Sequence, residues 1–169
     1  RQPLDAFRLQ ANGSTEFALS NSYIHFWRWA SWWAFDASHV EQPRTEQARS
    51  DRTGPGLICF LTATGYLTGP GFRGMREYLR RRASHGWIIN LSPEGKKPPP
   101  RNAVFAIETP VCIGIFARTT ATDDDIPADM HYLDLHGTSA EKLADLDTLT
   151  FDDRRWRPVR TQWHSPFTP

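Results

Sequence analysis

A glycine-rich stretch directly follows the first strongly apolar run of the chain. The run is GLICFLTA, residues 56–63, and the stretch is TGYLTGPGFRGMREYLRR, residues 64–81. The run has the length and composition of a fully buried strand of the kind found in parallel sheets. The stretch then lies at the carboxyl edge of that strand, where α/β proteins bind their ligands.

The loop in this stretch is a candidate substrate-facing loop, built from Gly65, Gly69, Gly71 and Phe72. Its glycines permit positive φ angles and close approach of the backbone to a ligand, or they form only a tight turn. Tyr66 flanks the loop and either lines a binding pocket or packs as an ordinary loop aromatic.

Positive charge is concentrated just after this loop. From Arg73 to Arg101 there are eight Lys or Arg residues against two acidic ones, whereas residues 121–153 hold ten acidic residues against Lys142 alone. A basic region of this kind suits contacts with a polyanion, although two solvated faces on a neutral protein are the simpler explanation of such a charge pattern. The candidates for phosphate contact are Arg80, Arg81, Arg82, Lys96, Lys97 and Arg101.

Metal and disulfide chemistry are not predicted. Six scattered His residues and two lone Cys residues have no metal-ligand spacing, and Asp123–Asp125 are interpreted as a turn. Cys59 and Cys112 each lie within an apolar run, so we expect both in the core of a cytoplasmic protein.

The surrounding pattern predicts one α/β unit of 169 residues. Residues 21–37 form an amphipathic helix with Tyr23, Phe26, Trp27 and Trp33 on its apolar face. Further predicted elements are a helix over 72–83, strands over 56–63 and 86–91, two strands within 103–118, a strand over 130–135, and a helix that starts with a capping box at Thr138 and Glu141. No apolar run reaches the length of a membrane helix, so no membrane partner is expected.

Five strings occur in an order and spacing that resemble the N-6 adenine DNA methyltransferase region of type ISP restriction–modification enzymes. They are NSYIHFWRWASWWAFD, GLICFLTATGYLTGPGFRGMREYLRR, WIINL, NAVFAIETPVCIGIFAR and GTSAEKLADLD, and they span about residues 20–150. The sequence departs from the family pattern at Ser31–Trp33, Ser139–Ala140 and Ala103, which affects surface contacts.

The resemblance implies an α/β fold, here the C-terminal half of a Rossmann-like methyltransferase sheet with an antiparallel edge hairpin. It also implies that the parent enzyme uses S-adenosylmethionine and flips a DNA adenine into an aromatic pocket. Phe105 matches the position of the stacking aromatic in related enzymes, and Tyr66 is the second candidate for this target-base pocket. Phe105 is alternatively an ordinary core residue of a strand.

Two family signatures are missing from these 169 residues. There is no Asn-Pro-Pro-aromatic tetrapeptide, which supplies the catalytic groups, and no glycine-rich strand-to-helix turn for the cofactor. We therefore expect a fragment that follows the catalytic tetrapeptide, is inactive alone and does not bind the cofactor alone. Its expected partners are DNA and the missing N-terminal half of the core, for which it should expose a large apolar edge.

The predicted organisation has three parts: an irregular lead-in over 1–19, the half-core over 20–150, and an irregular tail or linker over 151–169. The alternative function is a DNA-binding or partner-binding remnant without catalysis, which should be a stable monomer.

Overall fold

The computed structural model describes residues 4–9, 15, 17–36, 55–119 and 125–169. Asp123 and Asp124 of the predicted turn and residue 37 of the predicted helix over 21–37 lie outside these residues. Among the described residues, no helix combines the length and the apolar character needed to cross a membrane.

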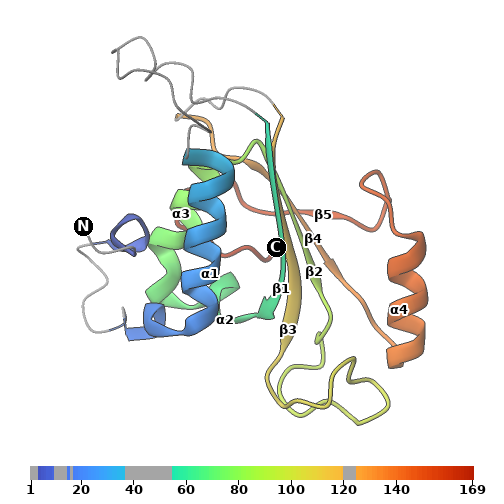
Figure 1. Cartoon of the computed structure of the whole chain (residues 1–169). Coiled ribbons are helices and arrows are strands. Elements are labelled where there is room, and N and C mark those ends of the chain that lie inside the picture. The colour runs from blue at the N-terminus through green and yellow to red at the C-terminus, as the bar shows by residue number, and fades with distance from the viewer. Residues whose placement is uncertain (1–3, 10–14, 16, 37–54, 120–124) are drawn as a thin grey trace, which may run out of the picture.

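The centre of the fold is a five-stranded mixed sheet in the order β1-β3-β2-β4-β5 (Figure 1). Its strands are β1 (Gly56–Ala63), β2 (His85–Asn90), β3 (Val111–Arg118), β4 (Asp129–Asp134) and β5 (Arg157–Pro158). Only β2 and β4 pair in parallel, whereas β1–β3, β2–β3 and β4–β5 are antiparallel. The prediction of a partial Rossmann-like α/β fold with antiparallel pairing is confirmed.

Two expected strands differ from the structure. β1 is an antiparallel edge strand with only one fully buried residue, Ile58, rather than a buried parallel strand. Residues 103–109 form turns instead of a strand, because Ile107 N–H bonds to Phe105 O and Lys97 N–H to Glu108 O within the loop. A backbone whose N–H and C=O groups are bonded within the loop in this way is not available for pairing with a neighbouring strand.

Helices cover the two faces of the sheet unequally. The first face packs against η1 (Asp5–Phe7), α1 (Ser22–Ser31), η3 (Trp32–Asp36), α2 (Gly65–Thr68), η5 (Pro70–Phe72) and α3 (Arg73–Arg82). We call it the α1–α3 face. The second face, which we call the α4 face, packs against α4 (Ser139–Thr148). Figure 1 shows α1, α2 and α3 on one side of the sheet and α4 on the other.

Strand alternation assigns residues to these faces. Phe60, Gly114 and Ile88 lie in one cross-strand row on the α1–α3 face, and Trp27 of α1 packs over them at 5.0 Å from the Phe60 ring. A Cβ on Gly114 would collide with the Tyr66 hydroxyl, so glycine at this point lets the helical layer approach the sheet. The neighbouring row of Cys59, Ile115 and Trp87 points to the α4 face.

Helix α1 contacts the sheet through a narrower stripe than its pattern predicts. Ile24 and Trp27 are buried, as helical spacing requires. Phe26, Trp29 and Trp33 are more than half exposed, so the assignment of Phe26 and Trp33 to the core is wrong. They project from another side of the helix than Trp27.

The capping box of α4 is confirmed. Glu141 N–H donates to Thr138 Oγ1 at 3.3 Å, and Thr138 N–H donates to a Glu141 carboxylate oxygen at 2.7 Å.

Candidate nucleic-acid interface

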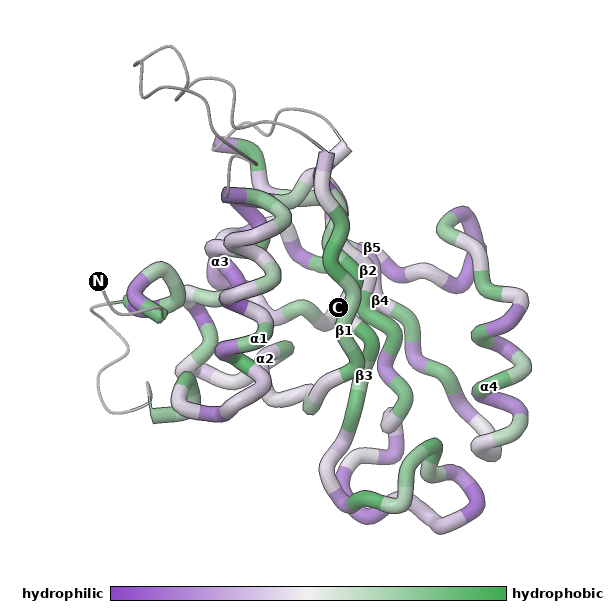
Figure 2. Tube along the Cα trace, viewed as in Figure 1, coloured by the Kyte–Doolittle hydropathy of each residue, from purple (hydrophilic) through white to green (hydrophobic). Residues whose placement is uncertain are grey.

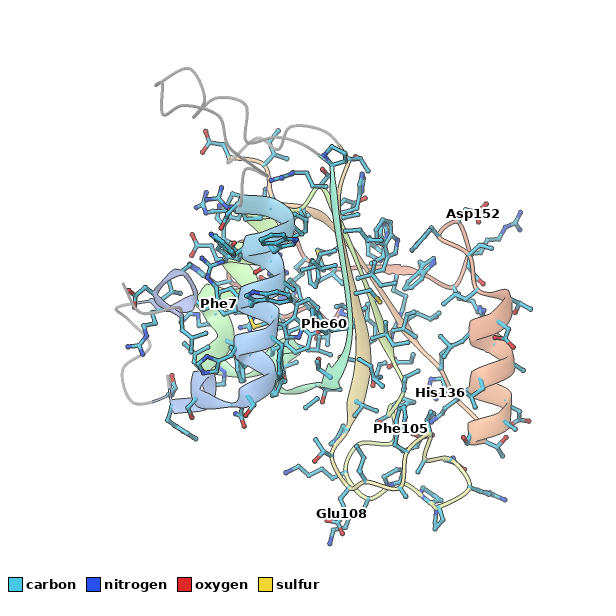
Figure 3. All side chains as sticks on the ribbon, in the orientation of Figure 1. Phe7, Phe60, Phe105, Glu108, His136 and Asp152 are labelled. Atoms are coloured by element: carbon cyan, nitrogen blue, oxygen red, sulfur yellow. The ribbon has the colours of Figure 1, made fainter. Side chains whose placement is uncertain are left out.

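The candidate interface is the loop 91–110, which joins β2 to β3 at the end of the sheet where β1 also ends. Thr64 N–H, just past β1, donates to Pro110 O at 3.0 Å and ties the two segments together. Figure 3 shows Phe105 and Glu108 on this loop, beyond the end of the sheet. The loop therefore projects from a rigid support.

A buried lysine of α4 fastens this loop. Lys142 Nζ lies 3.0 Å from both carboxylate oxygens of Glu94, 2.9 Å from Leu91 O and 3.0 Å from Asn102 O. The lysine side chain is fully buried. An ammonium has three donors, so these four oxygens saturate it and hold both ends of the 91–102 segment against α4. A further bond runs from Ser139 N–H to Arg101 O at 2.8 Å.

Three cations project from the fastened loop. Lys96, Lys97 and Arg101 are all exposed. Lys97 has φ of 55°, in the left-handed region, and its Nζ lies 3.6 Å from a Glu108 carboxylate oxygen. An ion pair this exposed is weak and exchanges readily for a phosphate. The loop thus presents cations at fixed positions, as phosphate contacts require.

Phe105 is the aromatic candidate on the same loop. It is 40% exposed, and Ile107 beside it is 51% exposed. The predicted alternative, a strand-core residue, is wrong because no strand forms here. Its ring is accessible to a base, and aromatic rings stack on bases without regard to sequence.

Tyr66 is not exposed on the same surface as Phe105. Its side chain is fully buried between Trp27 and Phe167, at ring distances of 5.5 and 6.2 Å. Burial is the main cause that raises the pKa of its phenol well above the ordinary value. The prediction that Tyr66 lines a target-base pocket is therefore wrong for this fold, since the ring is part of the core.

The glycine loop is a closely packed turn in which Gly71 is buried, although Gly65 is exposed. Gly65, Gly69 and Gly71 lie outside the left-handed region, because the positive-φ glycines of the described chain are Gly95 and Gly137. A Cβ on Gly69 would lie 2.7 Å from Gly65 O, and one on Gly71 would collide with Thr15 O. Phe72 is itself buried. These residues make a tight internal turn, which was the alternative interpretation.

The arginines of α3 bind the chain's own C-terminal segment. Arg80 is fully buried and donates to the carbonyl oxygens of Arg160, Trp163, Ser165 and Pro166. Burial lowers its pKa to about 10, which still leaves the guanidinium charged at neutral pH. The prediction that Arg80 contacts a phosphate is wrong for this fold, because its side chain is fully buried and bonded to these carbonyl groups.

Arg81 and Arg82 are half exposed but already have partners. Arg81 pairs with Glu77 at 3.0 Å and lies over the Trp163 ring at 4.1 Å. Arg82 Nε lies 2.9 Å from an Asp36 carboxylate oxygen. Binding a phosphate would have to displace these contacts. The accessible phosphate candidates are therefore Lys96, Lys97 and Arg101.

Two anchoring residues were not predicted. Lys142 was identifiable only as the single cation of an acidic region. Arg76, which donates to the carbonyl oxygens of Tyr66, Gly69 and His164, was identifiable only as one of several α3 arginines.

The two cysteines differ in exposure. Cys59 is exposed on β1, contrary to the prediction, whereas Cys112 is buried as expected. In the described chain, no group of three or more His, Cys, Asp or Glu residues is arranged to hold a metal ion.

Comparisons with known proteins show where this architecture occurs. No family model matches the chain, and no curated protein matches it. Three of the solved structures that share its fold are described below. The type ISP restriction–modification enzyme LlaGI, as a nuclease-deletion mutant with a DNA substrate mimic, matches with a TM-score of 0.65 and 19% identity over 97% of this chain. LlaBIII, an ATP-dependent type ISP enzyme bound to DNA, matches with a TM-score of 0.59 and 18% identity over 98% of this chain.

The DrdV–DNA complex, determined by cryo-EM, matches with a TM-score of 0.59 and 20% identity over 87% of this chain. This chain covers only 13%, 12% and 15% of the DrdV, LlaBIII and LlaGI chains. The fold described here is therefore similar to one segment of large proteins whose structures were determined with DNA.

Proposed function

We propose that the chain is part of an S-adenosylmethionine-dependent DNA methyltransferase that modifies adenine N6 within a restriction–modification system. Its role there is to contact DNA through the loop 91–110 and to supply Phe105 to the target-base pocket. The observation that carries the proposal is the likeness of 97% of the chain to a segment of LlaGI in complex with a DNA substrate mimic.

The five matched strings support the same proposal independently. They lie within residues 20–150 and include both the glycine turn and the loop with Phe105. The loop adds physical support, because its three exposed cations and one exposed ring combine the two kinds of contact that hold a flipped base and its backbone.

The glycine loop does not fit a cradle for S-adenosylmethionine. Gly69 and Gly71 already touch the chain's own carbonyl groups, and Tyr66 is closed within the core. We therefore assign the cofactor and the methyl transfer to the missing N-terminal half. Mixing the 169-residue chain with labelled S-adenosylmethionine and DNA should give no labelled DNA.

The test measures binding of the chain to a labelled duplex by fluorescence anisotropy over a salt titration. The test variant is Lys96→Ala/Lys97→Asn/Arg101→Ala, with Asn at 97 because it tolerates the left-handed region. The control variant, Arg73→Ala/Arg154→Ala/Arg160→Ala, removes the same charge from other exposed positions. We expect the slope of log K against log salt to fall by about one per loop cation in the test variant only. Equal slopes in the two variants would show that the loop is not the DNA contact.

A non-catalytic DNA-binding or partner-binding role is the second candidate. The burial of Tyr66 favours this non-catalytic role. Tyr66 was one of the two residues predicted to line the target-base pocket, and its ring is packed inside the core. Methyl transfer measured after the chain is combined with the rest of the proposed parent enzyme distinguishes the two functions. Only the methyltransferase function predicts activity in that experiment.

A further inference from the structure

The loop 91–110 has an apolar tip. Residues 103–107 read AVFAI and form neither helix nor strand. Phe105 is 40% exposed and Ile107 is 51% exposed. Figure 2 shows hydrophobic and hydrophilic stretches following one another along this loop, at the lower end of the sheet. The proposed function uses the Phe105 ring and the cations of the loop, but it gives the exposed Ile107 side chain no task.

The backbone around Ile107 is held on both sides. Ile107 N–H donates to Phe105 O at 2.8 Å, and Lys97 N–H donates to Glu108 O at 3.5 Å. Val104 is half buried and packs against the hydrophobic cluster on the α4 face. A single exposed isoleucine on a surface needs no explanation. An isoleucine on a backbone fixed in this way, however, is presented at a defined position.

The charges around the tip favour a polyanion. Three exposed cations share the loop, namely Lys96, Lys97 and Arg101. The carboxylate of Glu108 lies 3.6 Å from Lys97 Nζ, and the carboxylate of Glu94 is bound by Lys142. Both acidic residues of the loop therefore have a cationic partner, and the surface around the apolar tip is net positive.

Duplex DNA has the matching chemistry, because its phosphates lie outside and its stacked bases form an apolar interior. An anionic membrane surface offers a similar combination. A segment that binds a membrane buries an extended apolar face, however, whereas this tip exposes two large side chains on a fixed backbone. A gap of one base step admits a single side chain, so the tip fits DNA better.

Extrusion of a base creates such a gap. The extruded base loses its stacking on both neighbours, and an apolar side chain that enters the vacated space restores part of that contact. Isoleucine is one of the residue types that proteins insert between base steps. Its β-branched side chain has few rotamers, so little rotational entropy is lost on insertion. One ring cannot hold the extruded base and fill the gap together, but Ile107 is a separate side chain two residues beyond Phe105.

We propose that Ile107 is a wedge that enters the base stack of bound DNA, in the gap from which the target base is extruded. The inference rests on the proposed function, because it requires the loop 91–110 to contact DNA. It divides the task at the tip between two side chains. Phe105 stacks on the extruded base outside the duplex, and Ile107 keeps the gap open within it.

The test compares binding of the 169-residue chain to two labelled duplexes of one sequence, measured by fluorescence anisotropy. One duplex is intact, and the other carries a single abasic site opposite an ordinary base. The abasic site provides the gap without extrusion of a base, so the experiment does not require the recognised DNA sequence. The chain should bind the abasic duplex about tenfold more tightly than the intact duplex.

Three variants locate the source of this preference. Ile107→Ala should bind the two duplexes equally, while its affinity for the intact duplex and its salt dependence stay unchanged, because these depend on phosphate contacts. Ile107→Leu should keep the preference, since leucine is also an effective wedge. The matched control is Ile126→Ala. Ile126 is 65% exposed and precedes β4 at the opposite end of the sheet, so its removal should change nothing.

Equal binding of the two duplexes by the unchanged chain, with the salt slope of the loop cations intact, would refute the wedge and leave the proposed DNA contact standing. A preference that survives in Ile107→Ala would also refute it, and loss of that preference in Phe105→Ala would assign the insertion to Phe105. Equal binding together with sedimentation on phosphatidylcholine–phosphatidylserine vesicles that Ile107→Ala weakens would assign the tip to a membrane. Absence of binding to both duplexes at low salt would overturn the DNA contact and the wedge together.

Discussion

Two buried cationic side chains in this protein, Lys142 and Arg80, bind backbone carbonyl groups in its interior. Lys142 holds the loop 91–102, and Arg80 holds the segment 160–166. A buried cation is tolerated only when its donors are satisfied, which is the case for Lys142 through Glu94 and two carbonyl oxygens. The presentation of the loop 91–110, the proposed DNA contact, thus depends on a fully buried residue.

Replacing Lys142 with Met tests this dependence. The change leaves the Glu94 carboxylate, Leu91 O and Asn102 O without their donor, so we expect a loss of about 2–3 kcal/mol in the free energy of unfolding. The loop 92–102 should also become sensitive to limited proteolysis while the rest of the chain stays resistant. Leu143→Met, at the exposed neighbouring position, is the control. Unchanged protease sensitivity of the loop would contradict the fastening role.

The same contact predicts a pH dependence. Burial alone raises the pKa of Glu94, but hydrogen bonds, first that from Lys142, outweigh it, so the pKa lies below the ordinary 4.5. Below pH 4.5 the unfolded state then binds the proton more readily than the folded state, so stability falls as the pH falls through the folded pKa. Urea unfolding between pH 6 and pH 3 should show this loss, and Glu94→Gln should reduce its slope. An unchanged slope in Glu94→Gln would contradict this account.

At the scale of elements, two strand glycines make room for the large side chains that cover the α1–α3 face of the sheet. Gly114 lies in the middle of β3, under Trp27 and Tyr66. Gly86 lies in β2, under Met130 and Phe116. Both sites are tight, but the atoms above them differ in how far they can move.

Alanine at the two sites should therefore have different effects. At position 114 the new Cβ would meet the Tyr66 hydroxyl and lie 3.0 Å from the Trp27 ring, and both rings are locked in the core. We expect Gly114→Ala to lower the free energy of unfolding by about 3 kcal/mol. Gly86→Ala meets mainly the flexible Met130 side chain and should lower it by about 1 kcal/mol. Chemical denaturation checks both, and Tyr66→Phe should partly rescue Gly114→Ala. Equal losses at the two sites would contradict this account.

At the scale of the whole molecule, the C-terminal segment completes the core. Phe167 is fully buried against Tyr66 and Phe116, its N–H donates to Leu67 O, and Arg80 lies 4.5 Å from its ring centroid. Val159, just after β5, is buried as well. Residues 156–167 therefore act as part of the fold, although only β5 is regular.

Phe167→Ala should accordingly destabilise the entire chain. Loss of a buried aromatic side chain typically lowers the free energy of unfolding by about 3–5 kcal/mol. Circular dichroism during thermal unfolding should show one transition at a lower temperature, rather than a separate loss of the tail. Phe151→Ala, which removes an exposed ring from the same region of the sequence, should shift the transition much less. An unchanged transition in Phe167→Ala would mean that the segment is not docked in solution.

The sequence by itself determined the elements whose signals are local. The apolar runs of β1 and β2, the amphipathic period of α3 and the capping box of α4 all depend on residues that are close in sequence. Each forms an element at about the predicted position, although β1 is an antiparallel edge strand. The basic residues Lys96, Lys97 and Arg101 were also located from composition, whereas Phe105 was selected from the family resemblance and expected within a strand.

Only the tertiary structure decided which side chains face solvent and which are buried. Arg80 and Lys96 are both basic residues of one region, yet the first is buried under the C-terminal segment and the second is exposed. Tyr66 and Phe105 are both loop aromatics, yet only Phe105 is accessible. The difference arises from contacts between residues 46 to 101 positions apart along the chain, such as Cys112 and Phe167 around Tyr66. Composition and period carry no information on such distant contacts, because they record only a residue's neighbours along the chain.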